Sequence, residues 1–356
     1  MDRRIKLGIV GLGFGTGWYR IHKAEIDPFF EVIAVCDKIQ ERCQEFLKIA
    51  SAEVYADFDE MLQKADIQAV ALMTQPQGRA NLVRKCAAAG KHILTTKPFE
   101  RDAQAAFDVL NEVRSAGIVV QLNSPNPELS DELRTIFDWQ KEYDLGRPIS
   151  AHWESYNRYD EKSGQGGAWM DSVSECPAAP IFRIGIYGVN DLLALMGEVK
   201  SVQVTTSRIF TGRPTPDNAH LLMLFENGAT ASVNANFCIS DGYCYPATLM
   251  LHYERGTIFK RQISLGVERE NWGKFTSLEL ELHARFQNKT VSEKKTLSPD
   301  FRSGSFQMEN FYKAIRGDKS IGTQDSALQI AHGIAVFEAI SDAEISGKQV
   351  SVKKIK

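Results

Sequence analysis

Several patterns that indicate a metal-binding, membrane or nucleic-acid-binding protein are missing from this sequence. The six cysteines (36, 43, 86, 176, 238 and 244) form no CxxC pair and the seven histidines show no HExxH spacing, so we expect no metal site. The net charge of −3 and the lack of a long Lys/Arg tract argue against nucleic acid. No apolar stretch is long enough to span a membrane. Because Met1-Asp2-Arg3-Arg4 leads straight into an apolar segment, we expect no signal peptide and a cytoplasmic protein with reduced thiols.

A glycine-rich turn is the most informative feature that is present. It reads Gly11-Leu12-Gly13-Phe14-Gly15-Thr16-Gly17, follows the apolar run 5–10, and precedes the apolar segment 31–36, which leads to Asp37. This order predicts a dinucleotide site, because glycines admit the pyrophosphate to a helix N-terminus and the acid accepts hydrogen bonds from the ribose. Thr16 stands where a third glycine or alanine is usual, and a glycine turn without a ligand is the alternative.

The expected cofactor is NAD, with NADP possible. Asp37 favours the free 2′-hydroxyl of NAD and repels the 2′-phosphate of NADP, whereas Lys38 and Arg42 soften that repulsion. The candidate cofactor-binding residues of this segment are Gly11, Gly13, Phe14, Gly15, Thr16, Asp37, Lys38 and Arg42.

Residues 1–123 alternate apolar strands with helical segments, a pattern typical of an α/β doubly wound parallel sheet. We predict that they form an NAD(P)-binding Rossmann domain. The predicted strands cover 5–10, 31–36, about 53–55, 67–74, 92–96 and 118–123, and the predicted helices 17–26, 38–50, 58–64, 78–89 and 102–116. Ligands bind outside the carboxyl ends of such strands, which adds Thr74, Gln75, Lys97 and Asn123 to the candidate site.

The pattern changes after the turn formers of 124–127, and we predict an α+β domain over 124–356 for substrate binding and oligomerisation. Its expected core is one large, mainly antiparallel open sheet with helices on one face. The predicted strands are 150–157, 199–210, 219–225, 229–237, 247–253, 257–264, 276–286 and 289–296, and the predicted helices 128–141, 180–196, 304–316 and 323–345. We expect the two domains to enclose a cleft, and the open face of the sheet to be buried in a homodimer or homotetramer.

Several of these segments recur in one family in the same order. They are the glycine turn, Ala34-Val35-Cys36-Asp37, Thr74 with the helix that ends at 88–92, Lys97-Pro98-Phe99, the segment 185–193, and the segment 310–317. Together they resemble the Gfo/Idh/MocA oxidoreductases, the family of glucose–fructose oxidoreductase and inositol dehydrogenase, over nearly the whole chain. The resemblance implies a Rossmann domain followed by a sugar-binding domain, assembly into dimers or tetramers, and NAD(P)-dependent oxidation or reduction of one hydroxyl or ketone of a sugar or polyol.

The sequence departs from the family pattern at three places. The usual Glu-Lys-Pro is Thr96-Lys97-Pro98, and the usual Thr-Pro-Asn-x-x-His ends in Arg79. The usual Asp and His that lie four residues apart are Arg183 and Tyr187, so Tyr replaces the ordinary base, as in glucose–fructose oxidoreductase itself. Lys97 is the ordinary catalytic residue that is retained, which puts the standard alcohol dehydrogenase mechanism in doubt.

The candidate catalytic residues are Lys97, Tyr187 and Arg183. An ammonium group at Lys97 can stabilise developing charge on the reacting oxygen, and the Tyr187 hydroxyl can exchange its proton. Arg183 can bind a substrate carboxylate or a polar sugar edge. The alternatives are a surface lysine, a core tyrosine, and an arginine paired with Asp171, Glu175 or Asp191. The candidate substrate-binding residues are Lys97, Trp169, Arg183, Tyr187, Asn190 and Asp191.

Trp169, which ends the glycine-rich loop 163–169, either stacks on a sugar ring or packs as a hydrophobic plug. The expected activity is NAD-dependent hydride transfer to or from a small carbohydrate, with no nucleic acid or membrane partner. Two alternatives stay open: NAD-dependent, redox-assisted elimination or glycoside cleavage, and a non-catalytic dinucleotide-binding regulator.

Overall fold

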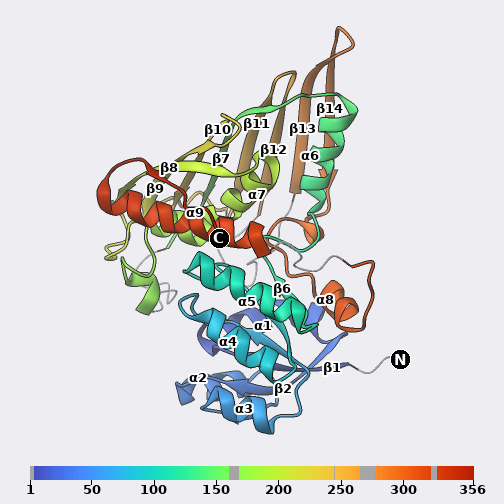
Figure 1. Ribbon diagram of the computed structural model, residues 1–356, viewed down its shortest axis with the longest axis vertical. Helices are drawn as coiled ribbons and strands as arrows, with labels where there is room; N and C mark the ends of the chain where they lie inside the picture. The colour runs from blue at the N-terminus through green and yellow to red at the C-terminus, as the bar shows by residue number, and fades with distance from the viewer. Residues whose placement is uncertain (1–3, 160–167, 244, 265–276, 322–326) are drawn as a thin grey trace. The chain divides into compact units, whose positions relative to one another are not determined.

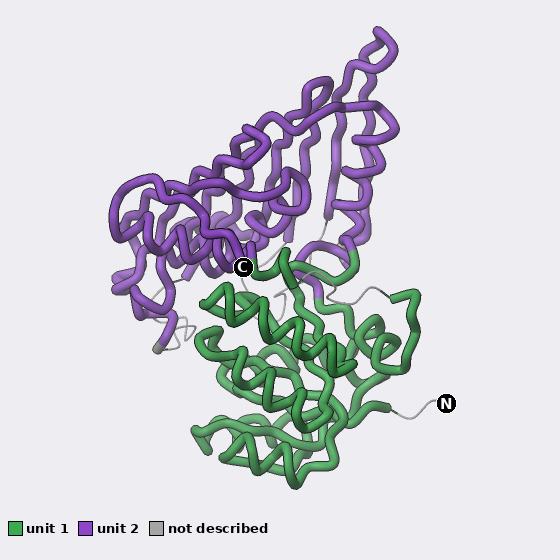
Figure 2. Tube along the Cα trace, viewed as in Figure 1, with its two compact units in different colours: residues 1–128, 306–331 green, residues 129–305, 332–356 purple. Residues whose placement is uncertain are grey.

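The computed structural model describes residues 4–159, 168–243, 245–264, 277–321 and 327–356. These residues group into two compact units, shown in Figure 2. The first unit contains residues 1–128 and 306–331, and the second contains residues 129–305 and 332–356. Within the described residues, no helix is long and apolar enough to cross a membrane.

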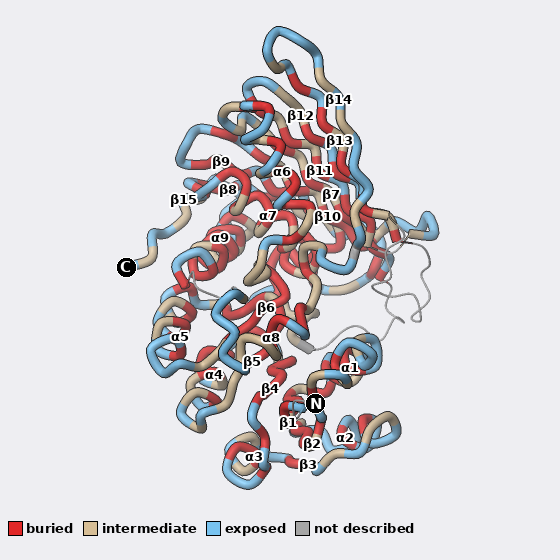
Figure 3. Tube along the Cα trace, turned by 90° about the vertical axis from the view of Figure 1, so that its right-hand side faces the viewer, coloured by how far each residue is buried: buried red, intermediate tan, exposed pale blue. Residues whose placement is uncertain are grey.

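The first unit is built on a six-stranded parallel sheet, as the sequence predicts (Figure 1). The strand order is β3-β2-β1-β4-β5-β6. The chain adds β2 and β3 on one side of β1 and β4 to β6 on the other, so the strand order reverses between β1 and β4. The strands are β1 (Ile5–Val10), β2 (Phe30–Cys36), β3 (Glu53–Tyr55), β4 (Ala69–Leu72), β5 (His92–Thr95) and β6 (Val120–Leu122). All four residues of β4 are completely buried, because helices cover both faces of a doubly wound sheet (Figure 3).

The helices of the first unit join consecutive strands. They are α1 (Leu12–Ile26), α2 (Gln40–Leu47), α3 (Phe58–Lys64), α4 (Arg79–Ala88) and α5 (Ala103–Ser115). One later helix, α8 (Met308–Ile315), also belongs to this unit. We expected the helix over 304–316 to cover the second sheet, and that placement is wrong, because Met308 and Phe311 are buried in the core of the first unit. The Phe311 ring stacks on Phe30 of β2 at a centroid distance of 5.6 Å.

The second unit is built on a nine-stranded sheet in the order β14-β13-β12-β11-β7-β10-β9-β8-β15. Its strands pair antiparallel except for β7 and β10, which run parallel. The strands are β7 (Pro148–Tyr156), β8 (Val199–Ser207), β9 (Asn218–Phe225), β10 (Thr230–Asn236), β11 (Ala247–Tyr253), β12 (Gly256–Ile263), β13 (Ser277–Phe286), β14 (Lys289–Leu297) and β15 (Val350–Ser351). Burial alternates along them, as in β13, where Leu278, Leu280 and Leu282 are buried. The predicted fold class is therefore confirmed.

Helices pack on one face of this sheet and share its core. They are α6 (Asp131–Glu142), α7 (Ile186–Met196) and α9 (Ala327–Ser346), and a π-helix (Ile181–Gly185) leads directly into α7. Gly188 lets α7 approach the sheet, because a Cβ atom there would overlap the indole ring of Trp153 on β7. This close packing fixes the position of the helix that carries Tyr187.

Candidate active site

The glycine turn connects β1 to α1 in a conformation that depends on Gly11. This residue is the N-cap of α1, has φ of +88°, and a Cβ atom on it would lie 2.8 Å from the carbonyl carbon of Met73. Glycine is therefore required there both by the backbone conformation and by the close passage of the segment after β4. A Cβ on Gly15 would lie 3.0 Å from Ile9, so Gly15 keeps α1 close to the sheet. Phe14 is 47% exposed on this turn.

Asp37 directly follows β2 and braces the glycine turn. One carboxylate oxygen accepts a hydrogen bond from Leu12 N at 2.8 Å, and the other accepts one from Ile39 N at 2.9 Å. Arg42 Nη1 lies 3.6 Å from the same carboxylate, and the Arg42 guanidinium lies within 3.3 Å of the place that a Cβ on Gly13 would occupy. The structure thus brings the turn, Asp37 and Arg42 together, while Lys38 is exposed.

These residues fit a dinucleotide. Gly13 is exposed at the start of α1, where a Cβ atom would lie 3.3 Å from the Arg42 guanidinium, and the carboxylate of Asp37 stands at the adjacent strand end. Thr16 occupies the third motif position at this turn. The Oγ1 atom of Thr16 is buried without a hydrogen-bond partner among the described residues.

The ends of β4, β5 and β6 carry the other predicted residues of this edge. Asn123, after β6, accepts hydrogen bonds at its Oδ1 atom from Lys97 N at 3.0 Å and from Thr96 Oγ1 at 3.1 Å. The Lys97–Pro98 peptide bond is cis. Thr74 is half-buried and Gln75 is exposed at the end of β4. Asn123 therefore has a role that sequence analysis did not specify: it holds the backbone of Lys97.

Arg183 lies in the π-helix of the second unit, a feature that sequence analysis missed. Its Cζ atom lies 4.3 Å from the ring centroid of Tyr159 and 4.9 Å from that of Phe237, so the guanidinium packs against two aromatic faces. The segment that leads into the π-helix is held by Ala178, whose φ is +42° and whose N–H donates to Glu344 of α9 at 2.6 Å. π-Helical turns occur frequently at functional sites.

Tyr187 lies in the first turn of α7 and packs against a tight turn formed by residues 302–305. Gly304 in this turn has φ of +86°, and a Cβ atom on it would lie 2.5 Å from Cε1 of Tyr187. The turn is closed by a hydrogen bond from Ser305 N to Arg302 O at 3.1 Å. Glycine at 304 therefore sets the position of the Tyr187 ring.

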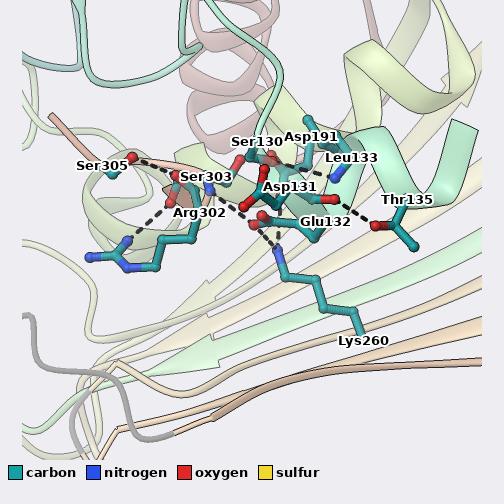
Figure 4. A network of polar contacts seen from close by, with 10 residues as sticks. All are labelled: Ser130, Asp131, Glu132, Leu133, Thr135, Asp191, Lys260, Arg302, Ser303 and Ser305. Atoms are coloured by element: carbon teal, nitrogen blue, oxygen red, sulfur yellow. Dashed lines mark hydrogen bonds and ion pairs between the residues drawn. The ribbon is translucent and has the colours of Figure 1, made fainter. Parts of the chain in front are cut away.

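A buried cluster of charges anchors this turn to α7 (Figure 4). Lys260 of β12 lies 3.0 Å from Glu132 Oε1 of α6 and 3.4 Å from Asp191 Oδ2 of α7, and none of the three side chains is more than 4% exposed. Ser303 N donates to Glu132 at 2.9 Å, and Ser303 Oγ donates to the other oxygen of Asp191. Asp191 is one helical turn from Tyr187, so the turn 302–305 runs along one face of α7.

Burial and the Lys260 charge shift the pKa values of the two carboxyl groups of this cluster in opposite directions. Burial raises the pKa of Asp191, and the neighbouring Glu132 carboxylate adds to that rise. Burial alone would also raise the pKa of Glu132, but the Lys260 charge and the Ser303 N–H outweigh it and the pKa is lowered. Both oxygens of Asp191 bind groups inside the protein, which favours a structural role for Asp191 beside Tyr187 over the predicted substrate contact.

The remaining candidates lie near the same core. Trp169 packs against it, with its ring 6.5 Å from that of Phe182, which agrees with the alternative of a hydrophobic plug. Asn190 on α7 is half-buried. Residues 163–167 of the predicted glycine-rich loop lie outside the described residues. Asp171, an expected alternative partner of Arg183, lies 3.4 Å from Arg213.

Comparison with known proteins agrees with this geometry. The GFO/IDH/MocA model described as an oxidoreductase family with an NAD-binding Rossmann fold matches residues 5–124. The model of the GFO/IDH/MocA C-terminal domain matches residues 133–259. The resemblance stated from the sequence motifs is thereby confirmed.

Individual relatives are distant in sequence. D-apiose dehydrogenase of Paraburkholderia graminis is 22% identical over 250 residues, which cover 70% of this chain and 65% of that protein, slightly less than two thirds. Galactose 1-dehydrogenase of Pseudomonas fluorescens is 24% identical over 256 residues, with coverage of 71% and 77%.

Solved structures share the fold over the whole chain. The WlbA dehydrogenase from Bordetella pertussis, in complex with NADH and UDP-GlcNAcA, has a TM-score of 0.74 at 18% identity and 99% coverage of both chains. Levoglucosan dehydrogenase in complex with NADH has a TM-score of 0.71 at 17% identity, with coverage of 99% and 100%. The glycine turn, the matched family models and the shared fold lead to one conclusion: this chain belongs to the Gfo/Idh/MocA family of NAD-binding oxidoreductases.

Proposed function

We propose that the protein transfers a hydride between a nicotinamide cofactor and a hydroxyl or ketone carbon of a sugar, polyol or glycoside. The observation that carries the proposal is the placement of Lys97. Its backbone is fixed by Asn123 at the carboxyl edge of the sheet whose glycine turn and Asp37 form the dinucleotide site. A lysine at that edge is suited to a reacting oxygen, because its ammonium group stabilises negative charge there.

NAD supplies the hydride chemistry at nicotinamide C4 when it is bound, and the chain's residues act on the substrate oxygen. In this proposal Lys97 donates a hydrogen bond to that oxygen, and the Tyr187 hydroxyl exchanges a proton with it. Arg183 and Asn190 are the proposed substrate contacts. The predicted division into domains 1–123 and 124–356 assigns the cofactor to the first and the substrate contacts to the second.

A homodimer or homotetramer is also proposed. Strands alternate between buried and exposed side chains, and the face opposite the helices includes Leu222, which is 50% exposed, and Phe259, which is 40% exposed. Large apolar side chains on an otherwise polar sheet face favour burial against a second copy of the chain.

The experiment that tests the catalytic proposal compares Lys97→Ala, Tyr187→Phe and the surface control Lys48→Ala. Turnover of NAD⁺ is followed with D-apiose, galactose, myo-inositol and levoglucosan, and NADH binding is followed separately by fluorescence. We expect Lys97→Ala to lower turnover by an amount equivalent to about 2.7–4 kcal/mol, with little change in NADH affinity. Tyr187→Phe should lower turnover by about 10²–10⁴-fold.

Three outcomes would contradict the proposal. Normal turnover by Lys97→Ala would place the reacting oxygen elsewhere. NADH binding without turnover on any compound of a broad carbohydrate panel would favour the non-catalytic regulator. NAD that copurifies with the protein, together with cleavage of a glycoside and no net reduction of added NAD⁺, would favour redox-assisted cleavage.

A further inference from the structure

Arg79 is a fully buried cation close to Lys97, and the proposed mechanism does not use it. It is the first residue of α4 and is only 1% exposed, although arginine side chains are mostly exposed in proteins. Burial of a guanidinium is costly unless its donors are satisfied by well-placed acceptors. The contacts that Arg79 makes inside the protein therefore indicate what it does.

Those contacts join two strand ends. Arg79 Nη1 donates to Thr96 O at 2.6 Å and to Phe99 O at 3.2 Å, and it also donates to Pro98 O. The other terminal nitrogen of the guanidinium, Nη2, donates to the carbonyl oxygen of Thr74. The guanidinium thus connects the segment after β4 to the carbonyl groups on both sides of Lys97.

The charge of Arg79 is balanced by a buried carboxylate. Glu100 is 3% exposed and accepts hydrogen bonds from Gly78 N at 3.1 Å, Ala80 N at 2.8 Å and Arg101 N at 2.7 Å. Burial lowers the pKa of Arg79 to about 10, and the Glu100 charge opposes that change. Arg79 consequently remains charged at neutral pH, and its donors stay available to the loop.

We propose that Arg79 is the positioning residue for Lys97. It acts through the backbone carbonyls of Thr96 and Pro98, while Asn123 holds the N–H of Lys97 from the opposite side. The planar guanidinium has five donors, so it can bind carbonyl groups of both segments at once, which a single ammonium group cannot reproduce in the same geometry. This inference rests on the proposed role of Lys97 at the reacting oxygen.

The central test is Arg79→Lys, which keeps the positive charge but removes the planar guanidinium whose two terminal nitrogens bind the two segments. The matched control is Arg84→Lys on the same helix, because the Arg84 side chain is 38% exposed and pairs with Glu112. We expect Arg79→Lys to lower kcat by about 10²-fold, as a displacement of 1 Å in a reacting group does, with NADH affinity nearly unchanged. Turnover is measured with whichever of D-apiose, galactose, myo-inositol or levoglucosan the parent enzyme uses.

Three further measurements separate positioning from general stability. In the Lys97→Ala background, Arg79→Lys should have no additional effect on residual turnover, because the group that it positions is already absent. Added guanidinium chloride, below denaturing concentrations, should raise the kcat of Arg79→Ala without changing that of Lys97→Ala. Crystals of Arg79→Lys should show that Thr96–Phe99 has moved and that the 3.0 Å contact between Lys97 N and Asn123 has lengthened.

The outcomes distinguish this inference from the proposed function. If Arg79→Lys keeps full turnover while Lys97→Ala loses it, the positioning role is wrong and the catalytic proposal stands. Equal losses from Arg79→Lys in both backgrounds would also overturn it, since they would indicate a general structural effect. If Lys97→Ala is fully active, the proposed function itself fails. Should Arg79→Ala not fold, the comparison between Arg79→Lys and Lys97→Ala still decides the question.

Discussion

The turn that carries Gly304 offers a sharp test of how Tyr187 is positioned. In Gly304→Ala the new methyl group would lie 2.5 Å from Cε1 and 2.9 Å from Cδ1 of Tyr187. Non-bonded carbon atoms pack at about 3.5–4.0 Å, so the ring has to retreat by about 1 Å. The turn itself has little freedom to move, because Ser303 binds Glu132 and Asp191.

Two costs contribute to the expected loss of stability. A non-glycine residue in the left-handed region costs about 1–2 kcal/mol, and overpacking of a well-packed site costs about 1–3 kcal/mol. Gly228 provides a matched control, since it has φ of +87°, lies in the same unit, and has no atom within 4 Å of its potential Cβ. Gly228→Ala should therefore show the backbone cost alone.

The assay combines chemical denaturation with kinetics. The difference in unfolding free energy between Gly304→Ala and Gly228→Ala should measure the clash with Tyr187. This difference should largely disappear when the ring is removed by Tyr187→Ala. If Tyr187 transfers the proton, Gly304→Ala should also lower kcat by about 10²-fold, whereas Gly228→Ala should leave kcat unchanged. Equal stability and equal kcat of the two glycine variants would refute the reasoning.

The remaining predictions concern the cofactor, the buried charges and assembly. NADH should bind more tightly than NADPH at equal salt, because Asp37 repels a 2′-phosphate; tighter binding of NADPH would contradict this assignment. Lys260→Met should lower the unfolding free energy by about 3–5 kcal/mol at neutral pH, since it leaves two carboxylates buried without their cation. Because the pKa of Glu132 is lowered from its ordinary value of 4.5, its ionised form stabilises the parent protein at pH values above 4.5, and this contribution is lost as the pH falls. The difference in unfolding free energy between the parent and Lys260→Met should therefore become smaller in acid. A difference that grows in acid would reject this explanation. Light scattering should detect a dimer or tetramer that Leu222→Glu weakens, and a monomeric parent at micromolar concentration would exclude the proposed assembly.

Features that depend on local sequence were predicted well. A strand buried on both faces must be apolar throughout, which is why the run around β4 was recognisable, and Gly11 marks a turn that no other residue fits. The alternation in β13 likewise indicates a sheet with one buried face. In contrast, α8 was placed in the wrong unit, because its amphipathic pattern shows that one face is buried but not which core it enters.

The supports of the candidate site depend on contacts that local patterns do not encode. Lys260 is 69 positions from Asp191 and 128 positions from Glu132, and each of these residues alone resembles an ordinary surface charge in the sequence. Gly304 looks like a common loop glycine until its contact with Tyr187 is known. The π-helix was missed because its residues are as apolar as those of the helix that follows it.

The departures from the family pattern acquire a physical meaning from these contacts. An arginine at 79 looked like the loss of a family histidine, yet its guanidinium binds the carbonyl oxygen of Thr96, the residue that stands where the family has glutamate. That contact uses the backbone of residue 96, so Arg79 holds the peptide next to Lys97 whichever side chain stands at 96. A glutamate side chain at 96 would replace the threonine hydroxyl that donates to Asn123, and would put a carboxylate beside the acceptor oxygen that holds Lys97 N. The local chemistry is thus consistent with a retained lysine that is supported by a different set of neighbours.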